Sequence, residues 1–544
     1  MKKLMIITAA AVTIALGAIA QQSTPEEGIK MYNYKKYQTA QKILTPLSVK
    51  DARANYYLGL SYLDAGNTLK AKYQFEKYPD DPANISGTAR VAFAMKDAAK
   101  GNEIAKGLAA KAKKKEVAPL VYAAEALTYS DGTDLQQAIQ WYKDALAKDA
   151  NNIEAHLGLA DSYRKITGGG GEAMTNYEFI VEKDPKNSLV LSRIGDLWYE
   201  ARTYPSALEF YGKAKDADNT NPLPFKSLSQ AYQRTGKYDM ALTNIRQYIT
   251  LSDNTMSDEI SFVEILYQAK ANCEAAKKAQ ELLSQDPPAD KKTSLYGILG
   301  FAQADCGDSI EAQKNLRTYF AIQKPKSITP AAYIEYGKLW LKLNNLDSAT
   351  FYYMKGIEGD TAKNKTDIYR QIAEAYRGKK EYCRSAEWYN NLIKSNPTTQ
   401  ALDHFWCTVM YYYCKDLKNA VSAAERFEEK YPEQTSSTYW HARILANVDS
   451  EATQGTAAPL YLKWIEKIGA DVDKKDKKSD VLKAYEYLAA YYFNSKDKEK
   501  MTIYLDKLRA LDPNDFYLKQ IEEAEKSGGK KDSGPKAAPA PKKK

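Results

Sequence analysis

The sequence predicts an all-α protein built from a long row of antiparallel helix pairs. Three observations favour this fold. A spaced pattern of large and small residues recurs along most of the chain, prolines follow several copies of it, and the 42 tyrosines need many half-buried packing positions. At 544 residues the chain is too long for one hydrophobic core, so an elongated repeat array accounts for its length.

The first half of each copy reads as a helix with one apolar face. In one copy Tyr369 is followed at the third, fourth and seventh positions by Ile372, Ala373 and Tyr376. Residues at this spacing share a helix face, and the small one lets a neighbouring helix approach closely. The same spacing recurs at 191–198, 225–232, 333–340, 404–411 and 485–492.

The second half reads as a helix that carries a small residue at a fixed place. These small residues are Ala40, Ala71, Ala138, Ala173, Ala207, Ala241, Ala312, Ala349, Ser385, Ala420 and Ala458, with Met501 in the last copy. Pro397, Pro432 and Pro513 are expected to end second helices, because proline cannot continue a helix. Glycines such as Gly66 and Gly236 are expected in the turns, where a left-handed residue ends a first helix.

This pattern resembles the tetratricopeptide repeat family over most of the chain. The resemblance implies a right-handed superhelical solenoid of about 13 antiparallel helix pairs. It also implies that ligands lie in the concave groove lined by the first helices, and that the protein binds other proteins or peptides.

Four segments are expected along the chain. Residues 1–20 are expected to be a signal peptide, because Lys2 and Lys3 precede an apolar run that ends in Ala18-Ile19-Ala20. Residues 21–115 are expected to form N-terminal repeat units that are partly degenerate, and 116–525 the main solenoid. Residues 526–544 are rich in Lys, Pro and Ala and are expected to be a disordered tail.

These segments predict export from the cytoplasm. We expect the protein in the periplasm, or at the periplasmic face of the outer membrane, of a Gram-negative bacterium. No later run of 18 apolar residues predicts a transmembrane segment in the mature chain. The chain is also similar in style to exported repeat proteins of the Bacteroidetes, some of which serve secretion or gliding machinery.

The distribution of charge argues against nucleic-acid binding, and the small number of histidines and cysteines argues against catalysis. The net charge of +9 falls almost entirely on the N-terminal lysines and the tail, so the folded part is nearly neutral. Three histidines and five cysteines offer little for catalysis or metal binding, and we expect no catalytic, cofactor or metal site. The cysteines are interpreted mostly as small buried hydrophobes, with at least one thiol unpaired because their number is odd.

The candidate partner-binding residues lie beside the core stripe of the first helices. They are Lys226, Gln230 and Arg234, then Arg370, Glu374 and Arg377, then Phe405, Val409 and Tyr412, with Asp161, Arg164, Ser192 and Asp196 as further groove candidates. The last three of the main set form a second apolar stripe on their helix, which either binds a ligand or packs on a neighbouring unit.

Two functions from different classes follow. The first is a non-enzymatic protein-binding scaffold or adaptor of the cell envelope that uses the concave face. The alternative is an envelope binder whose basic C-terminal tail engages an anionic polymer or lipid.

Overall fold

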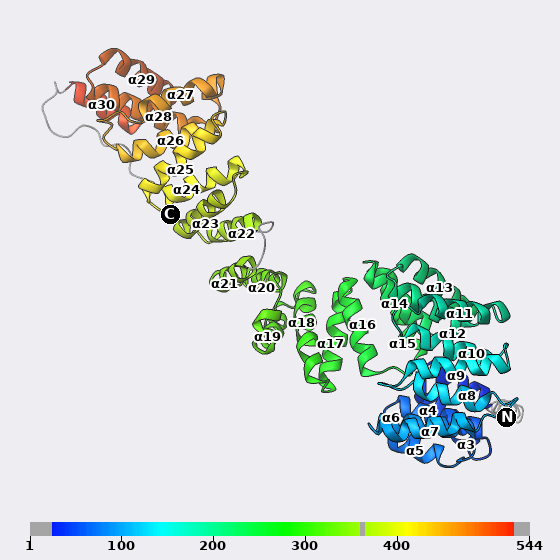
Figure 1. Ribbon diagram of the computed structural model, residues 1–544. Helices are drawn as coiled ribbons and strands as arrows, with labels where there is room; N and C mark the ends of the chain where they lie inside the picture. Colours follow the sequence, from blue (N-terminus) through cyan, green and yellow to red (C-terminus); the bar gives the residue numbers. More distant parts are fainter. Residues whose placement is uncertain (1–23, 359–364, 527–544) are drawn as a thin grey trace, which may run out of the picture. The chain divides into compact units, whose positions relative to one another are not determined.

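The computed structural model describes residues 24–358 and 365–526, and these residues form helices and no strand. Contacts divide the chain into two compact units, Met1–Cys306 and Gly307–Lys544. Within each unit the helices follow one another as antiparallel pairs, each packed on its sequence neighbours (Figure 1). The predicted all-α repeat solenoid is confirmed.

The first unit holds eight helix pairs followed by one further helix. Its helices are α2 (Pro25–Asn33), α3 (Tyr37–Leu47), α4 (Ala52–Asp64), α5 (Thr68–Phe75), α6 (Pro82–Ala94), α7 (Ala98–Ala110), α8 (Ala118–Thr128), α9 (Leu135–Lys148), α10 (Ile153–Arg164), α11 (Gly170–Lys183), α12 (Ser188–Glu200), α13 (Tyr204–Ala217), α14 (Pro222–Arg234), α15 (Tyr238–Leu251), α16 (Met256–Gln268), α17 (Asn272–Ser284) and α18 (Ala289–Asp305).

The second unit begins with a single helix and continues with five pairs and a final helix. Its helices are α19 (Ser309–Ile322), α20 (Pro330–Lys342), α21 (Leu346–Glu358), α22 (Lys365–Gly378), α23 (Tyr382–Ser395), α24 (Ala401–Tyr413), α25 (Leu417–Lys430), α26 (Thr435–Val448), α27 (Ala458–Ile468), α28 (Lys478–Asn494), α29 (Lys498–Leu511) and α30 (Phe516–Lys526). Eight and five complete pairs in the described residues agree with the predicted number of about 13.

Close approach of neighbouring helices explains the small residues of the pattern. Ala207, Ala241 and Ala420 lie on second helices and are completely buried. On the first helix α12, a Cβ added to Gly195 would lie 2.5 Å from the ring of Tyr211 on α13. A larger residue at these positions would therefore push the two helices apart.

The turns inside the pairs share one backbone conformation. Gly66 and Gly236 have φ angles of +83° and +73°, as predicted for glycines that end a first helix. In other pairs a lysine takes this left-handed position, as Lys96 (φ 67°) and Lys496 (φ 64°) do. The backbone geometry therefore persists where the glycine signal is missing from the sequence.

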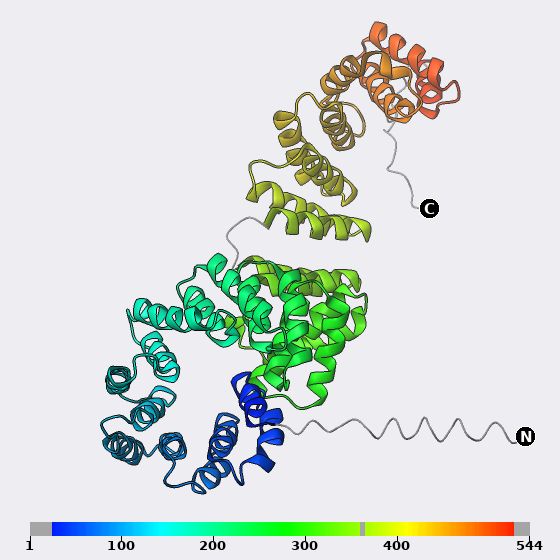
Figure 2. The same cartoon turned by 90° about the vertical axis from the view of Figure 1, so that its right-hand side faces the viewer.

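The first unit curls back on itself, so that its first pair meets the loops of later pairs. Lys30 Nζ lies 2.8 Å from a carboxylate oxygen of Asp218, after α13. The Thr39 hydroxyl on α3 donates to Asp253, after α15, at 2.6 Å. In Figure 2 the blue helices lie beside green helices of the same unit, in agreement with these contacts.

The expected bounds of the four segments stay predictions. One hydrophobic cluster runs from Ala89 through Leu120 to Leu159, across the expected boundary at 115/116, whereas the compact units divide after Cys306. The expected signal peptide and the tail beyond Lys526 lie outside the described residues. In the part of the chain that is described, no helix has the length and apolar character needed to span a bilayer.

Four of the five cysteines form disulfides, which corrects their interpretation as mostly small buried hydrophobes. Cys273 bonds to Cys306, and Cys383 bonds to Cys414. Cys407 is the buried free thiol that the odd number required. The interpretation missed the pairing because each bond joins neighbouring repeats, at sequence separations of 33 and 31 residues.

Candidate functional site

The inner face of the first unit lines a partly open cavity of about 380 Å³, which we call the lumen. Its wall comes mainly from the first helices of six consecutive pairs, α2, α4, α6, α8, α10 and α12. The side chains that line it are Tyr32, Asn33, Lys35, Tyr37, Tyr57, Leu60, Asp64, Arg90, Val121, Tyr122, Glu125, Tyr129, Tyr142, Glu154, Leu157, Lys165, Leu189 and Arg193, together with Gly158.

Tyrosine rings form much of this wall. Tyr32 packs edge-on against Tyr57 at 5.3 Å between ring centroids, and Tyr122 packs edge-on against the buried Tyr56 at 5.7 Å. Burial raises the pKa of Tyr57 and of Tyr122 above the ordinary value of a phenol. These rings therefore stay neutral near pH 7, and they offer apolar faces together with hydroxyl donors.

Arg90 is one of the residues that line the lumen and is only 6% exposed. Its Nη2 donates to Asp64 at 3.0 Å, and the Tyr32 hydroxyl donates to the same carboxylate at 2.8 Å. The Nε of Arg90 has no hydrogen-bond partner among the described residues, and the same holds for the Nε of Arg193. A buried donor without a partner costs free energy, and both Nε atoms are covered by neighbouring protein atoms.

Glu125, on α8, is an acidic residue of the lumen wall. It accepts a hydrogen bond from the Tyr56 hydroxyl. Burial raises the pKa of its carboxyl to about 7, although the Tyr56 hydrogen bond and Arg90 oppose this shift. Near neutral pH the carboxyl is therefore partly protonated and can both donate and accept hydrogen bonds.

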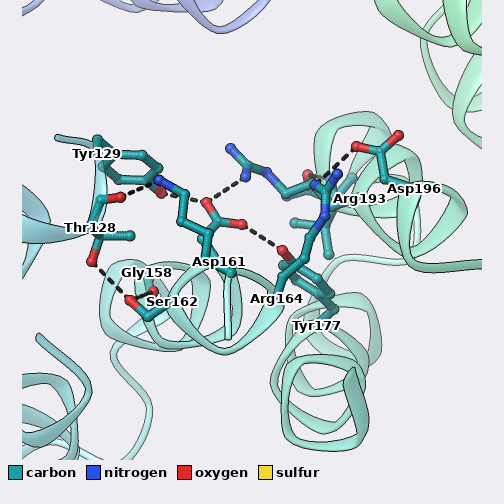
Figure 3. A network of polar contacts seen from close by, with 12 residues as sticks. Thr128, Tyr129, Gly158, Asp161, Ser162, Arg164, Tyr177, Arg193 and Asp196 are labelled. Atoms are coloured by element: carbon teal, nitrogen blue, oxygen red, sulfur yellow. Dashed lines mark hydrogen bonds and ion pairs between the residues drawn. The ribbon is translucent and has the colours of Figure 1, made fainter. Parts of the chain in front are cut away.

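Asp161 organises a second polar cluster beside the lumen, shown in Figure 3. Its carboxylate accepts hydrogen bonds from the hydroxyls of Tyr129 and Tyr177 and forms an ion pair with Arg193. Asp161 is 3% exposed, so these three donors from three different helices replace the water that it loses. The cluster ties α10 to the C-terminal end of α8, to α11 and to α12.

Neighbouring groups extend the same cluster. Arg164 pairs with Asp196 at 3.0 Å, and the Tyr211 hydroxyl donates to Asp196 at 2.8 Å. The predicted groove residues Asp161, Arg164 and Asp196 are thus held together by the structure, while Ser192 is buried and donates to the carbonyl of Ser188.

The remaining predicted residues of the first unit lie on α14. Lys226 pairs with Asp258 on α16 at 2.8 Å, and Arg234 donates to the Tyr199 hydroxyl at 3.2 Å. Gln230 is exposed. They lie on a first helix as expected, but they are not part of the lumen wall.

The predicted charged residues of the second unit lie on α22. Arg370 binds both carboxylate oxygens of Asp403, at 2.9 and 3.0 Å, and Glu374 is exposed. The guanidinium of Arg377 lies 3.8 Å from the ring centroid of Trp406 on α24. Sequence reasoning did not select Trp406, which with Arg377 forms a cation–π pair.

The predicted apolar stripe on α24 packs partly on the next pair. Val409 is 2% exposed and belongs to the core, so it is not an exposed surface. The rings of Phe405 and Tyr412 lie edge-on to Trp440 on α26, at 6.3 and 5.4 Å. Packing on the neighbouring helix pair thus explains these contacts. Partner binding by the half-buried Phe405 and Tyr412 stays a prediction.

The histidine and thiol closest to a catalytic arrangement are His404 and Cys407. Burial raises the pKa of Cys407 to about 12 and lowers that of His404 to about 4. The thiol therefore stays protonated and unreactive at neutral pH. Within the described residues no cluster of three or more His, Cys, Asp or Glu side chains is arranged to hold a metal ion.

Comparison with known proteins agrees with the repeat geometry. No protein-family model matches the chain. A TPR repeat-containing protein of Methanocaldococcus jannaschii is 23% identical over 346 residues, which are 59% of this chain and 54% of that protein. This chain is a tetratricopeptide repeat protein.

Further similarities are weaker or shorter. Lipopolysaccharide assembly protein B of Escherichia coli K12 is 22% identical to this tetratricopeptide repeat protein over 169 residues, 30% of this chain and 43% of that protein. The chain therefore matches about half or less of the length of these two relatives. The crystal structure of the C-terminal part of a TPR repeat-containing protein from Cytophaga hutchinsonii is 24% identical and covers 48% of this chain and 98% of its own, with a TM-score of 0.33. A tetratricopeptide repeat protein from Parabacteroides merdae is 17% identical and covers 48% and 97%, with a TM-score of 0.31.

The lumen of this tetratricopeptide repeat protein is the site that sequence reasoning missed. Arg90, Glu125 and Tyr122 fall in or next to pairs that the sequence marked as degenerate. A signal was present, since charged residues on the first helices α6 and α8 interrupt otherwise apolar runs. Their meeting depends on the curvature of the unit, which one repeat does not reveal.

Proposed function

We propose that this protein is an exported, non-enzymatic scaffold of the cell envelope that binds other proteins. Its lumen holds an extended segment of a partner. The observation that carries this proposal is the lumen itself, where tyrosine rings and charged side chains from six first helices converge.

The chemistry of the lumen suits a polypeptide segment. Backbone carbonyls and side-chain oxygens of the segment would meet the ammonium group of Lys35, and its apolar side chains would pack on Tyr57 and Tyr122. Glu125 would accept hydrogen bonds from backbone N–H groups. Such a site recognises the shape and polarity of the partner segment and needs no catalytic group.

Two observations support an envelope location. Disulfides such as Cys273–Cys306 and Cys383–Cys414 persist in oxidising compartments, as expected after export. One relative is named for lipopolysaccharide assembly, which is a process of the envelope. We place the protein in the periplasm or at the periplasmic face of the outer membrane, with secretion or gliding machinery of a Bacteroidetes cell as candidate partners.

The test is affinity capture from native cells with crosslinking and mass spectrometry. The lumen variant carries Lys35→Glu and Glu154→Lys, and the control carries Glu209→Lys and Lys213→Glu, an exposed pair on α13 outside the lumen wall. Both variants keep the net charge. We expect the lumen variant to lose most of its captured protein and the control to keep it. Equal capture by both would reject the lumen as the binding site.

The tail offers the alternative function, because 526–544 holds seven lysines and one acidic residue. Deleting 527–544 separates the two proposals. Scaffold binding survives the deletion, whereas binding to an anionic polymer or lipid through the tail is lost and, in the full chain, weakens steeply as salt rises.

A further inference from the structure

The first helix pair supplies part of the lumen wall. Tyr32, Asn33, Lys35 and Tyr37 come from α2, α3 and the turn between them. If α2–α3 moved away from the later pairs, the lumen would lose these side chains and open on that side. The contacts that hold α2–α3 in place therefore decide whether this part of the wall is present.

Helix α3 is capped from the far end of the unit. Its own N-cap residue, Lys36, makes no side-chain hydrogen bond to the helix. Asp253, in the loop between α15 and α16, accepts from the backbone N–H groups of Gln38 at 2.7 Å and Thr39 at 3.0 Å, and from the Thr39 hydroxyl. The free N–H groups of a helix start need such an acceptor, and a carboxylate is a strong one.

A second aspartate holds helix α2. Asp218, at the C-terminal end of α13, pairs with Lys30 and accepts a hydrogen bond from the Tyr34 hydroxyl. Asp149 and Asp184 end α9 and α11 in the same way. Their side chains accept hydrogen bonds from the backbone N–H groups of Asn151 and Lys186, two residues away. Asp218 thus combines this local role with contacts to the first helix pair of the unit.

On the other side, α2–α3 packs on α4 through a small core. The four buried residues of this cluster are Ala40, Leu44, Ala54 and Leu58. Among the described residues α2–α3 packs on a neighbouring helix pair on one side only, and a pair with one such neighbour belongs to the less stable part of a repeat array. The two aspartate contacts are therefore a substantial part of what keeps the pair in place.

We propose that α2–α3 is a gate of the lumen, latched shut by Asp218 and Asp253. The gate opens when the latch contacts break, admits a partner segment, and completes the wall around it on closing. This inference rests on the proposed function for the identity of the ligand, but the opening itself needs no ligand to be measured.

The test is hydrogen exchange of the full-length protein, read by mass spectrometry without any partner. The latch variant carries Asp218→Ala and Asp253→Ala. The matched control carries Asp184→Ala, which removes an aspartate from the end of α11 that, among the described residues, makes no contact with α2–α3. We expect amides of residues 25–47 to exchange at least tenfold faster in the latch variant, which equals about 1.4 kcal/mol. Exchange in α8 to α11 should stay at the wild-type rate.

Two results would overturn the gate. Unchanged exchange of residues 25–47 would show that the aspartates do not hold the pair. Faster exchange across the whole first unit would show that α2–α3 is part of one cooperative core and no separate gate. Loss of partner capture by the lumen variant, with or without these results, concerns the binding function and not the latch.

Discussion

Cys383, at the start of α23, forms a disulfide with Cys414, at the end of α24, with 4.9 Å between their Cα atoms. The Cys273–Cys306 disulfide joins α17 to the end of α18 at the corresponding places. Each bond thus links the second helix of one pair to the following first helix. In a repeat array this interface between neighbouring helix pairs determines how the pairs stack.

Removing the bond should weaken the second unit. Replacing Cys383 and Cys414 by Ser is expected to lower the free energy of unfolding by about 3–4 kcal/mol, because the bond closes a loop of 31 residues in the unfolded chain. Denaturant unfolding under non-reducing conditions measures this. An unfolding midpoint equal to that of the wild type would show that the disulfide contributes nothing.

Asp161 should be costly to remove. Asp161→Ala leaves Arg193, Tyr129 and Tyr177 without their shared acceptor, which is expected to destabilise the first unit by about 3–5 kcal/mol. Adding Arg193→Leu should recover part of this loss, because the unpaired charge is then gone. If the double variant is as unstable as the sum of two independent losses, the cluster does not act as one unit.

Glu125 predicts a specific pH dependence. Its pKa of about 7 lies above the ordinary value of 4.5, so the unfolded chain releases this proton first and stability falls as the pH rises from about 4.5 to 7. Glu125→Gln should match the wild type near pH 4.5 and exceed it at pH 8 by up to about 3 kcal/mol. Melting curves at both pH values test this, and a constant difference between the proteins would contradict it.

The turn lysines predict stabilising substitutions. Lys96 has a φ of 67°, which a glycine adopts at less cost, so Lys96→Gly should stabilise the protein by about 0.5–1 kcal/mol. Gly236→Ala, at a φ of +73°, should destabilise it by about the same amount. The two melting temperatures should move in opposite directions, and movement in the same direction would argue against the shared turn conformation.

The small positions predict overpacking. Ala241 is completely buried on α15, so Ala241→Leu should cost about 1–3 kcal/mol. An exposed alanine-to-leucine change on the same helix is not available, so Met240→Leu, at a site that is 48% exposed, serves as the control and should leave stability nearly unchanged. Equal melting of both variants would place Ala241 outside the helix contact.

The fold could be predicted because residues within each repeat determine where its helices end and pack. Pro397 and Pro432 follow α23 and α25 as expected, and Ala207 and Ala420 lie on second helices as expected. These features depend on residues within about one repeat. They are therefore visible in the sequence wherever the pattern is intact.

Long-range features could not be predicted in this way. The contact between Thr39 and Asp253 joins residues 214 positions apart, and it depends on the curvature summed over several pairs. The lumen depends on the same sum. The disulfides were within reach, because Cys383 and Cys414 lie about one repeat apart at opposite ends of neighbouring helices.

The most direct test of the central claim is site-specific photocrosslinking in native cells. A photoreactive residue replaces Lys35 in the lumen wall in one protein and Lys213 on α13 in another. The lumen position is expected to crosslink to a distinct partner protein, and the outer position is not. A partner that crosslinks from Lys213 but not from Lys35 would contradict binding in the lumen.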